Sequence, residues 1–160
     1  MLPPLKRPLH IVLVEPQIPP NTGNVARLCA VTGSKLILIE PLGFSIGDRE
    51  LKRAGLEYWD QVFLHRYSSY TEYLASYPEA ARFLFSARAH CSFFDARFGE
   101  GCHLVFGSET RGLSASVLDS RSGDLVSIPM LPHRRSLNLS TAVGIATYEA
   151  LRQLLNTTVA

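Results

Sequence analysis

Short apolar runs alternate along the chain with stretches of helical spacing, and this alternation limits the fold more than any other feature. The apolar runs predict strands at residues 10–14, 35–39, 82–87, 103–106 and 125–128. The helical spacing predicts helices at residues 19–32, 47–53, 70–76, 114–119 and 138–155. Strands that alternate with helices favour an α/β fold, in which a mainly parallel sheet is flanked by helices.

The size and composition of the chain fit one domain with one core. It has 160 residues, of which 46% are hydrophobic and 19% charged, so we expect a single domain over residues 1–160 with a loose leader at residues 1–8. No apolar run reaches the roughly 18 residues of a membrane span, and the leader lacks the apolar core of a signal peptide. We therefore expect a cytoplasmic protein that does not bind membranes.

The cysteines and the overall charge carry little functional information. Cys29, Cys91 and Cys102 lack paired CxxC spacing, so neither a disulfide framework nor a metal site is predicted. The net charge of +2 is too small to identify a nucleic-acid binder. The basic residues are thirteen arginines and three lysines, and arginine suits phosphates and base edges, but ordinary surface usage explains this excess equally well.

Several common catalytic and nucleotide-binding motifs are absent. Gly99 and Gly101 match the start of GxGxxG, but Leu104 occupies the position of the third glycine. The segment 107–112 has the GxxxxG spacing of a phosphate-binding loop, but Leu113 replaces the required lysine. No HExxH pattern occurs. Hydrolysis of nucleoside triphosphates and zinc peptidase chemistry are therefore disfavoured.

Three polar loops follow predicted strands and are the candidates for a functional site. They span residues 16–24, 107–113 and 129–140. In parallel α/β sheets, ligands bind outside the carboxyl ends of the strands, so we expect these loops to converge. Each loop alone could equally be a helix cap or a turn.

The order of the three loops resembles a known family. NTGN at residues 21–24 with Arg27, GSETRGL at 107–113, and IPM at 128–130 followed by SLNLS at 136–140 are similar to the three motifs of the SpoU branch of the SPOUT methyltransferases. The resemblance extends to EPQIPPNTGNVARLCAVTG, EPLGF, LKRAGLEYW and RSLNLSTAVGIATYEALRQ, which together cover most of the chain. It is strongest toward the small, single-domain, TrmL-like enzymes that methylate the ribose 2′-oxygen of the tRNA wobble nucleotide.

The resemblance implies a fold, a cofactor and an assembly. It implies a deep trefoil knot in the C-terminal part of the sheet, a homodimer, and S-adenosyl-L-methionine bound at the knot, with S-adenosyl-L-homocysteine as product. The positions implied for cofactor contact are Ala87, Gly107, Ile128 and Ser136. Met130 and Leu137 add apolar walls of the kind that an adenine and a methionyl group need.

The resemblance also implies catalytic and RNA-binding residues. Arg27 is the family's candidate for assisting attack by the ribose hydroxyl; because a guanidinium stays protonated, we interpret it as a donor to the developing alkoxide or to a phosphate. Asn24, Glu109, Ser140 and Tyr148 are candidates for orienting Arg27 or the ribose, although Tyr148 could equally pack at a dimer interface. The expected tRNA anticodon-loop contacts are Lys52, Arg53, Arg111, His133, Arg134 and Arg135.

Two alternatives to wobble methylation remain open from the sequence. The enzyme could act on another tRNA or rRNA ribose, because the motifs concern cofactor and sugar, whereas target choice depends on less diagnostic surface. The chain could also be a non-catalytic RNA-binding module of the same fold. The joint presence of Asn21, Arg27, Glu109, Ser136 and Asn138 disfavours the second alternative, because binding alone does not need all of them.

Overall fold

The centre of the protein is a sheet of six strands whose neighbouring pairs are all parallel. The structure is a computed structural model that describes residues 2–47, 49, 53 and 59–157. Within these residues the spatial order of the strands is β3-β2-β1-β5-β4-β6. The strands are β1 (His10–Val14), β2 (Lys35–Ile39), β3 (Phe63–Tyr67), β4 (Arg82–Phe85), β5 (His103–Phe106) and β6 (Asp124–Val126).

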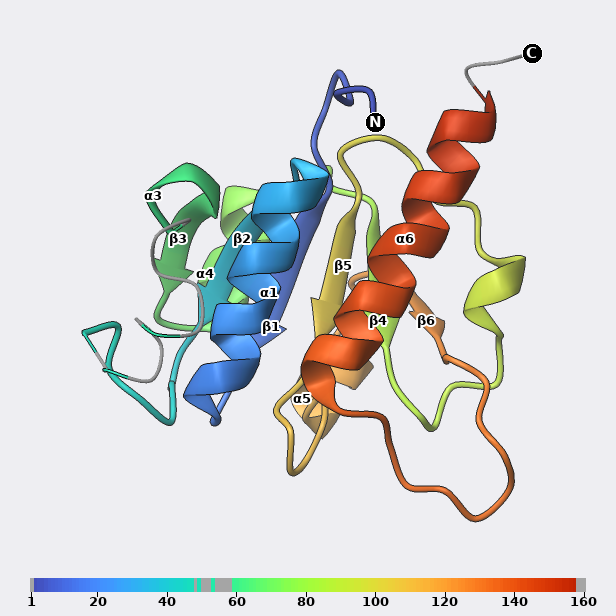
Figure 1. The fold of residues 1–160 in the computed structure, drawn as a ribbon. Coiled ribbons are helices and arrows are strands. Elements are labelled where there is room, and N and C mark those ends of the chain that lie inside the picture. The colour runs from blue at the N-terminus through green and yellow to red at the C-terminus, as the bar shows by residue number, and fades with distance from the viewer. Residues whose placement is uncertain (1, 48, 50–52, 54–58, 158–160) are drawn as a thin grey trace.

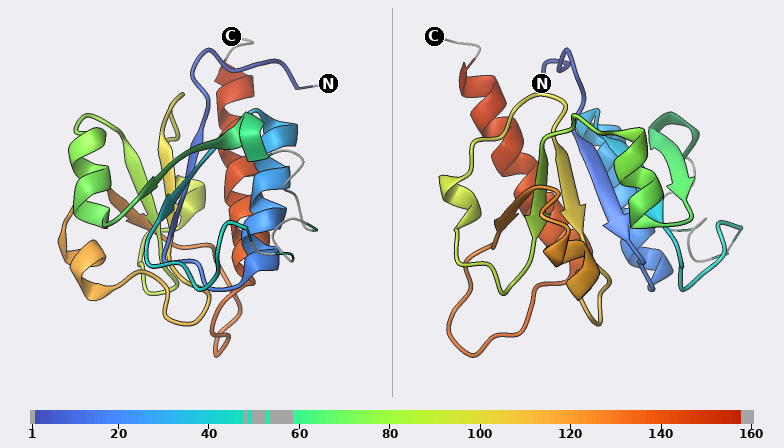
Figure 2. Two further views of the ribbon diagram at one scale, coloured as in Figure 1. Left: turned by 90° about the vertical axis from the view of Figure 1, so that its left-hand side faces the viewer. Right: turned by 180° about the vertical axis from the view of Figure 1, so that it is seen from behind.

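Helices cover both faces of the sheet. They are α1 (Pro19–Thr32), α3 (Trp59–Val62), α4 (Tyr70–Ser76), α5 (Ala115–Asp119) and α6 (Leu139–Thr157), with a short 3-10 helix, η2, at Phe93–Asp95. The two long helices, α1 and α6, lie side by side on one face (Figure 1). The view from behind shows α4 and α5 on the other face (Figure 2). The prediction of an α/β fold with a mainly parallel sheet is confirmed.

The apolar pattern of β1 explains why the sheet is buried on both faces. Ile11 and Leu13 contribute to the core under α1 and α6, whereas Val12 and Val14 contribute to the core on the other face. Successive side chains of a strand point to opposite faces, so a strand buried on both sides needs a continuous apolar run. Burying each such side chain stabilises the fold by roughly 1.5–3 kcal/mol.

The long helices end and pack as their sequences predict. α1 stops where Gly33 adopts a left-handed conformation, with φ of 71°, which a residue without a Cβ reaches at little cost. On α6, Val143, Ala146 and Ala150 are buried against the sheet. This spacing of three and four residues places them on one face of the helix.

Most predicted elements are confirmed, and the differences lie at short or edge elements. The strand predicted at 82–87 ends at Phe85, because residues 87–88 form a turn, and the strand predicted at 125–128 spans residues 124–126. β3, α3 and η2 were not predicted. β3 is an edge strand in which His65 and Arg66 interrupt the apolar run. The helix predicted at 47–53 lies largely outside the described residues.

The cysteines are unpaired in the structure. Cys29 and Cys102 are buried and Cys91 is exposed, and all three are free thiols. Burial raises the pKa of the Cys29 and Cys102 thiols to about 12, so both stay protonated. In the part of the chain that the structure describes, no helix has the length and apolar character needed to cross a membrane.

Candidate active site

The carboxyl ends of four strands bring four loops together at one edge of the sheet. β1 is followed by residues 15–18, β4 by residues 86–88, β5 by residues 107–114, and β6 by the long loop 127–138. Parallel strands finish at the same edge, so segments distant in sequence become neighbours there. The three loops predicted from the sequence converge as expected.

A cavity of about 460 Å³ opens between these loops. Its walls come from the ends of β4 and β5, the loops that follow them, the loop 127–138 and the first turn of α6. All six predicted cofactor-binding residues line it: Ala87, Gly107, Ile128, Met130, Ser136 and Leu137. Phe85, Phe106, Leu113 and Leu139 add apolar walls. A concave cavity of this size, with both apolar and polar walls, suits a small organic ligand.

The loop after β5 folds back on itself and forms one wall of the cavity. The Ser108 amide donates to the Gly112 carbonyl at 3.2 Å, and the Gly112 amide donates to the Ser108 carbonyl at 2.9 Å. Gly112 has φ of 68°, and a Cβ on Gly107 would lie only 1.9 Å from the Gly112 carbonyl carbon. The tight turn therefore requires glycine at residue 107, where no side chain fits, and favours it at residue 112.

Glu109 projects from this loop onto the start of α1. Its carboxylate accepts hydrogen bonds from the Gln17 amide at 2.8 Å, the Ile18 amide at 3.1 Å and Asn21 Nδ2 at 3.1 Å. Ile18 is the N-cap residue of α1 and offers no capping side chain, and the first turn has no acidic residue. Glu109 therefore supplies, from a distant loop, the acceptor and the negative charge that a helix N-terminus favours.

A chain of side-chain hydrogen bonds continues from Glu109 to α6. Asn138 Nδ2 donates to Asn21 Oδ1 at 3.0 Å, across 117 residues of sequence. Asn138 Oδ1 accepts from the Thr141 amide at 3.2 Å and from Ser140 Oγ at 2.8 Å, so Asn138 also caps α6. Asn21 thus joins the loop after β5 to the first turn of α6, and the two asparagines fix the relative positions of the three motifs.

The predicted catalytic residues divide into two groups. Glu109 lines the cavity, whereas Arg27, Asn24, Ser140 and Tyr148 are not among its lining residues. Asn24 and Arg27 are exposed on α1, and Tyr148 is exposed on α6. Among the described residues, no acidic side chain lies within ion-pair distance of Arg27. Within one chain, then, these four side chains lie outside the cavity lining, and their roles stay predictions.

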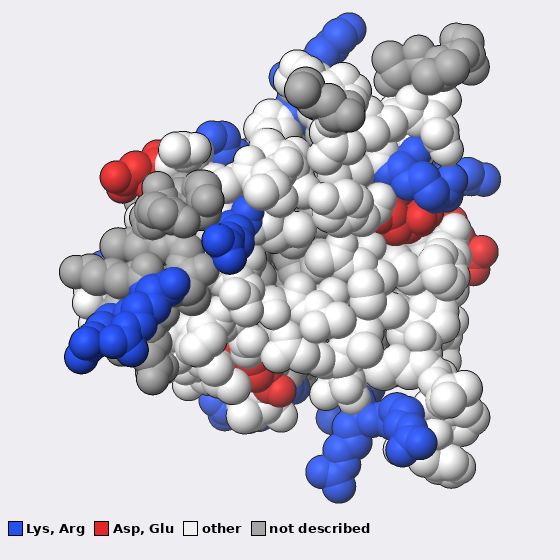
Figure 3. Space-filling model, viewed as in Figure 1, with Lys and Arg blue, Asp and Glu red and all other residues white. Residues whose placement is uncertain are grey.

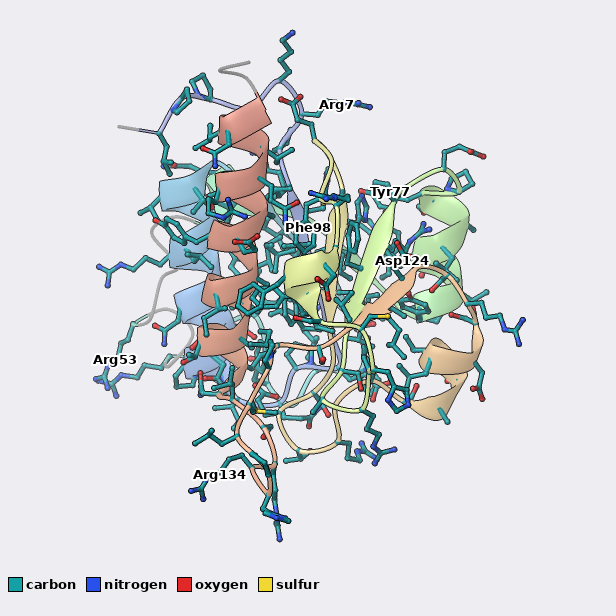
Figure 4. The ribbon with its side chains drawn as sticks, turned by 90° about the vertical axis from the view of Figure 1, so that its right-hand side faces the viewer. Arg7, Arg53, Tyr77, Phe98, Asp124 and Arg134 are labelled. Carbon is teal, nitrogen blue, oxygen red and sulfur yellow. The ribbon has the colours of Figure 1, made fainter. Side chains whose placement is uncertain are left out.

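Four of the six predicted RNA-binding residues lie in the loops that form the cavity. Arg111 and Arg135 line it, and His133 and Arg134 are exposed on the loop 127–138. Figure 4 shows Arg53 and Arg134 extending outward into solvent, and Figure 3 shows basic side chains clustered at the lower edge of the molecule. Lys52 lies outside the described residues.

Two residues that the sequence reasoning did not single out belong to the site. The backbone of Gln17 binds Glu109, and its Nε2 donates to the Glu15 carbonyl at 2.8 Å. Arg88 lines the cavity opposite the arginines already predicted. No sequence pattern identifies Gln17, because its main-chain amide, and not its side chain, binds Glu109. Arg88 could have been inferred from its place just after a predicted strand.

The doubly flanked parallel sheet and the three converging loops define an α/β protein with a ligand cavity at the carboxyl ends of β4, β5 and β6. The model of the SpoU rRNA Methylase family matches residues 8–148. The chain belongs to this family.

Characterised relatives are similar over nearly the whole chain. The tRNA (cytidine(34)-2′-O)-methyltransferase of Escherichia coli K12 is 45% identical over 147 residues, which cover 91% of this chain and 94% of that protein. A putative tRNA (cytidine(34)-2′-O)-methyltransferase of Bacillus subtilis is also 45% identical, over 91% of this chain and 92% of the relative.

Solved structures share the fold. A structure concerned with the 2-OH methylation of C/U34 on tRNA superposes with a TM-score of 0.88 and 49% identity, covering 94% of this chain and 98% of that one. The SpoU methyltransferase AviRb of Streptomyces viridochromogenes, in complex with the cofactor AdoMet, superposes with a TM-score of 0.82 and 25% identity, covering 95% and 60% of the two chains.

Proposed function

We propose that this protein transfers a methyl group from S-adenosyl-L-methionine to the ribose 2′-hydroxyl of the tRNA wobble nucleotide, a cytidine or uridine at position 34. The observation that carries this proposal is one cavity lined by the second and third family motifs, with the first motif joined to both through the hydrogen bonds of Asn21. It is supported by 45% identity, over 91% of the chain, to the Escherichia coli enzyme that acts on cytidine 34.

The cavity fits S-adenosyl-L-methionine in size and chemistry. Its volume of about 460 Å³ lies within the roughly 300–1,000 Å³ of typical ligand cavities. The apolar walls suit the adenine, and the backbone at Gly107, Ile128 and Ser136 offers polar contacts without bulky side chains. When bound, this cofactor supplies an electrophilic methyl group.

The residues of the chain supply binding, orientation and charge. We infer that Arg27 donates hydrogen bonds to the ribose oxygen as its proton leaves, or to the adjacent phosphate, because a guanidinium is a permanent cation with five donors. Asn24, Ser140 and Tyr148 orient Arg27 or the ribose. Glu109 holds the start of α1 through its three hydrogen bonds and so fixes the helix that carries Arg27.

An Arg27→Ala variant tests this role. Because Arg27 does not line the cavity, the variant should bind S-adenosyl-L-methionine with unchanged affinity by calorimetry. Its methyl transfer to tRNA should fall by about 100-fold or more, the usual effect of removing a donor to a developing oxyanion. A variant that keeps the full rate contradicts the role given to Arg27.

We further propose that the protein acts as a homodimer through α1 and α6. Ile18 and Val31 of the α1 segment and Ile145 and Tyr148 of α6 are exposed. The face over these helices is largely uncharged, and charged side chains lie around it (Figure 3). Contiguous exposed apolar surface marks an interaction site. A second copy seated there completes the RNA groove that one small domain leaves open.

A matched pair of substitutions tests the dimer. Ile145 on α6 and Leu125 on β6 have the same exposed fraction, 39%. Ile145→Asp should convert the dimer to a folded monomer that loses tRNA binding, whereas Leu125→Asp should stay dimeric. Analytical ultracentrifugation and tRNA filter binding distinguish the two. A wild-type protein that is monomeric at micromolar concentration contradicts the proposal.

Family membership supports three further features. We propose that residues 1–160 form one SPOUT methyltransferase domain, and that its C-terminal segment forms a deep trefoil knot. The proposed RNA contacts are Arg53, Arg111, His133, Arg134 and Arg135, together with Lys52. A tRNA substrate places the enzyme in the cytoplasm. The chain trace of an experimental structure tests the knot, and the dependence of tRNA affinity on salt tests the phosphate contacts.

Product mapping separates this function from its alternatives. The protein is incubated with cofactor and total tRNA, and nuclease digestion with mass spectrometry then locates the new methyl group. A methyl group on ribose 34 supports the proposal, and methylation only at another ribose contradicts the wobble assignment. Failure of a folded dimer to bind the cofactor by calorimetry indicates the non-catalytic RNA-binding module.

A further inference from the structure

A second cavity lies at the opposite edge of the sheet, where the strands begin. Its volume is about 480 Å³, and none of its lining residues lines the first cavity. Its walls come from the leader, from the first residues of β1, β2 and β5, and from the segment that follows α4. Figure 4 shows Arg7 and Tyr77 at this end of the molecule, opposite Arg134. β5 runs from His103, which lines the second cavity, to Phe106, which lines the first, a distance of roughly 10 Å at about 3.3 Å per residue.

Two basic side chains at this cavity have no acidic partner. Among the described residues, neither Arg7 nor Lys35 forms an ion pair. The stem of Arg7 lies along Gly101, and Lys35 Nζ donates to the Gln61 carbonyl at 2.6 Å, which leaves two of its N–H groups free. Glu79 is the acidic residue of the lining. Two cations and one carboxylate leave a net charge of +1 around the cavity.

The wall of this cavity is aromatic. The rings of His10 and His103 stack with centroids 4.4 Å apart and an interplanar angle of 29°. The ring of Tyr77 meets His103 edge-on at 4.8 Å. His103 is only 2% exposed, so the partly exposed rings of His10 and Tyr77 form the accessible part of this wall. Flat rings of this kind are the usual surface against which a nucleobase packs.

Two ring nitrogens at this wall lack hydrogen-bond partners. Arg82 Nε donates to Tyr73 Oη at 3.2 Å, and Tyr73 Oη lies 2.6 Å from His103 Nδ1. Tyr73 Oη can donate to or accept from His103 Nδ1, and no partner for His103 Nε2 is found in the described part of the chain. His10 Nδ1 is buried and likewise has no partner there.

Both histidines are neutral at physiological pH. Burial lowers the pKa of His103 to about 3, and the charges of His10 and Arg82 act in the same direction. Burial also lowers the pKa of His10, with Lys35 adding to this effect and the Gly101 backbone opposing it. The rings thus offer uncharged donors and acceptors, while the positive charge comes from Arg7 and Lys35.

We propose that this second cavity binds a nucleotide, with the phosphate between Arg7 and Lys35 and the base against the rings of His10 and Tyr77. An apolar ligand would leave both cations and both nitrogens unsatisfied. A bare phosphate would leave most of the 480 Å³ unfilled and the wall without a contact. The nucleotide is either a free mononucleotide or part of an RNA strand. The proposal does not depend on the methyl-transfer function.

Calorimetry with cytidine and adenosine 5′-monophosphate tests the proposal on the full chain. We expect one nucleotide per chain, with an affinity that falls about threefold to tenfold in Arg7→Gln and in Lys35→Gln. Two matched controls keep the wild-type affinity: Lys6→Gln removes a neighbouring leader cation, and Arg97→Gln removes an exposed cation that lines neither cavity. A 5′-phosphorylated RNA trinucleotide that binds more tightly than either monophosphate identifies RNA as the source, and equal affinities identify the free nucleotide.

Three results overturn the proposal. The first is a lack of binding at millimolar nucleotide. The second is an affinity that falls as much in Lys6→Gln or Arg97→Gln as in Arg7→Gln, since the positive charge of the whole protein then explains the binding. The third is inorganic phosphate binding as tightly as the nucleotides, since the aromatic wall then contributes nothing. Arg7 lies in the exposed leader, so its variant stays folded and decides the outcome even if Lys35→Gln is unstable.

Discussion

Replacing Gly107 by alanine places a methyl group inside the backbone of the loop after β5. The new Cβ would lie 1.9 Å from the Gly112 carbonyl carbon and 2.1 Å from the Leu113 nitrogen, whereas ordinary contacts begin near 3.4 Å. The backbone segments around residues 107 and 112 must therefore separate by the difference between 1.9 and 3.4 Å, about 1.5 Å. The opposing atoms belong to the main chain, so no side-chain rotation relieves the clash.

We expect Gly107→Ala to lower the free energy of unfolding by an amount at the upper end of the range for overpacking substitutions. Overpacking costs about 1–3 kcal/mol, and we expect about 2–3 kcal/mol here. For a domain of this size, that loss lowers Tm by about 4–12 °C. The displaced loop also forms a wall of the first cavity, so the affinity for S-adenosyl-L-methionine should fall about tenfold or more.

Calorimetric unfolding and cofactor titration measure both effects. Gly99→Ala is the control, because a Cβ at that exposed position meets no heavy atom within 4 Å. If Gly107→Ala keeps Tm within about 1 °C of the wild type and binds the cofactor equally well, the tight turn is not what shapes the cavity.

Two further predictions concern stability. Asn21→Ala should lower the free energy of unfolding by about 1–3 kcal/mol, because it leaves Asn138 Nδ2 without its partner; chemical denaturation checks this, and the exposed Asn24→Ala should change little. Burial lowers the pKa of His103 to about 3, so between about pH 6.5 and 3 the folded protein binds fewer protons than the unfolded chain. The contribution of neutral His103 to the free energy of unfolding is therefore intact above pH 6.5 and is lost as the pH falls. His103→Gln should therefore flatten the loss of stability on acidification by about 1 kcal/mol per pH unit, and parallel pH profiles of the two proteins would disprove this.

The central fold is predictable because its strands are buried on both faces. β1, β2 and β5 span the expected residues, because a short continuous apolar run bounded by polar loops is typical of a strand buried on both faces. β3 escaped prediction for the opposite reason. At the edge of the sheet one neighbour is missing, so polar residues such as His65 and Arg66 are tolerated and the apolar signal is lost.

The residues that line the first cavity were predictable from the sequence, but the hydrogen bonds that position its loops were not. Gly107, Ile128 and Ser136 follow from motif positions, and all line the cavity. The contact of Glu109 with the amides of Gln17 and Ile18 crosses about 90 residues of sequence. No local pattern encodes a bond between one loop's side chain and another loop's main chain. Only the common edge of a parallel sheet brings the two together.

The double role of Asn138 has a consequence for how the protein opens. Its amide group both caps α6 and binds Asn21, which in turn binds Glu109. Fraying of the first turn of α6 therefore removes the support of the loop that carries Glu109, so the two segments unfold locally as one cooperative unit. The amide hydrogens of Thr141 and Ile18 should then exchange with solvent at a shared rate, although they lie at opposite ends of the chain.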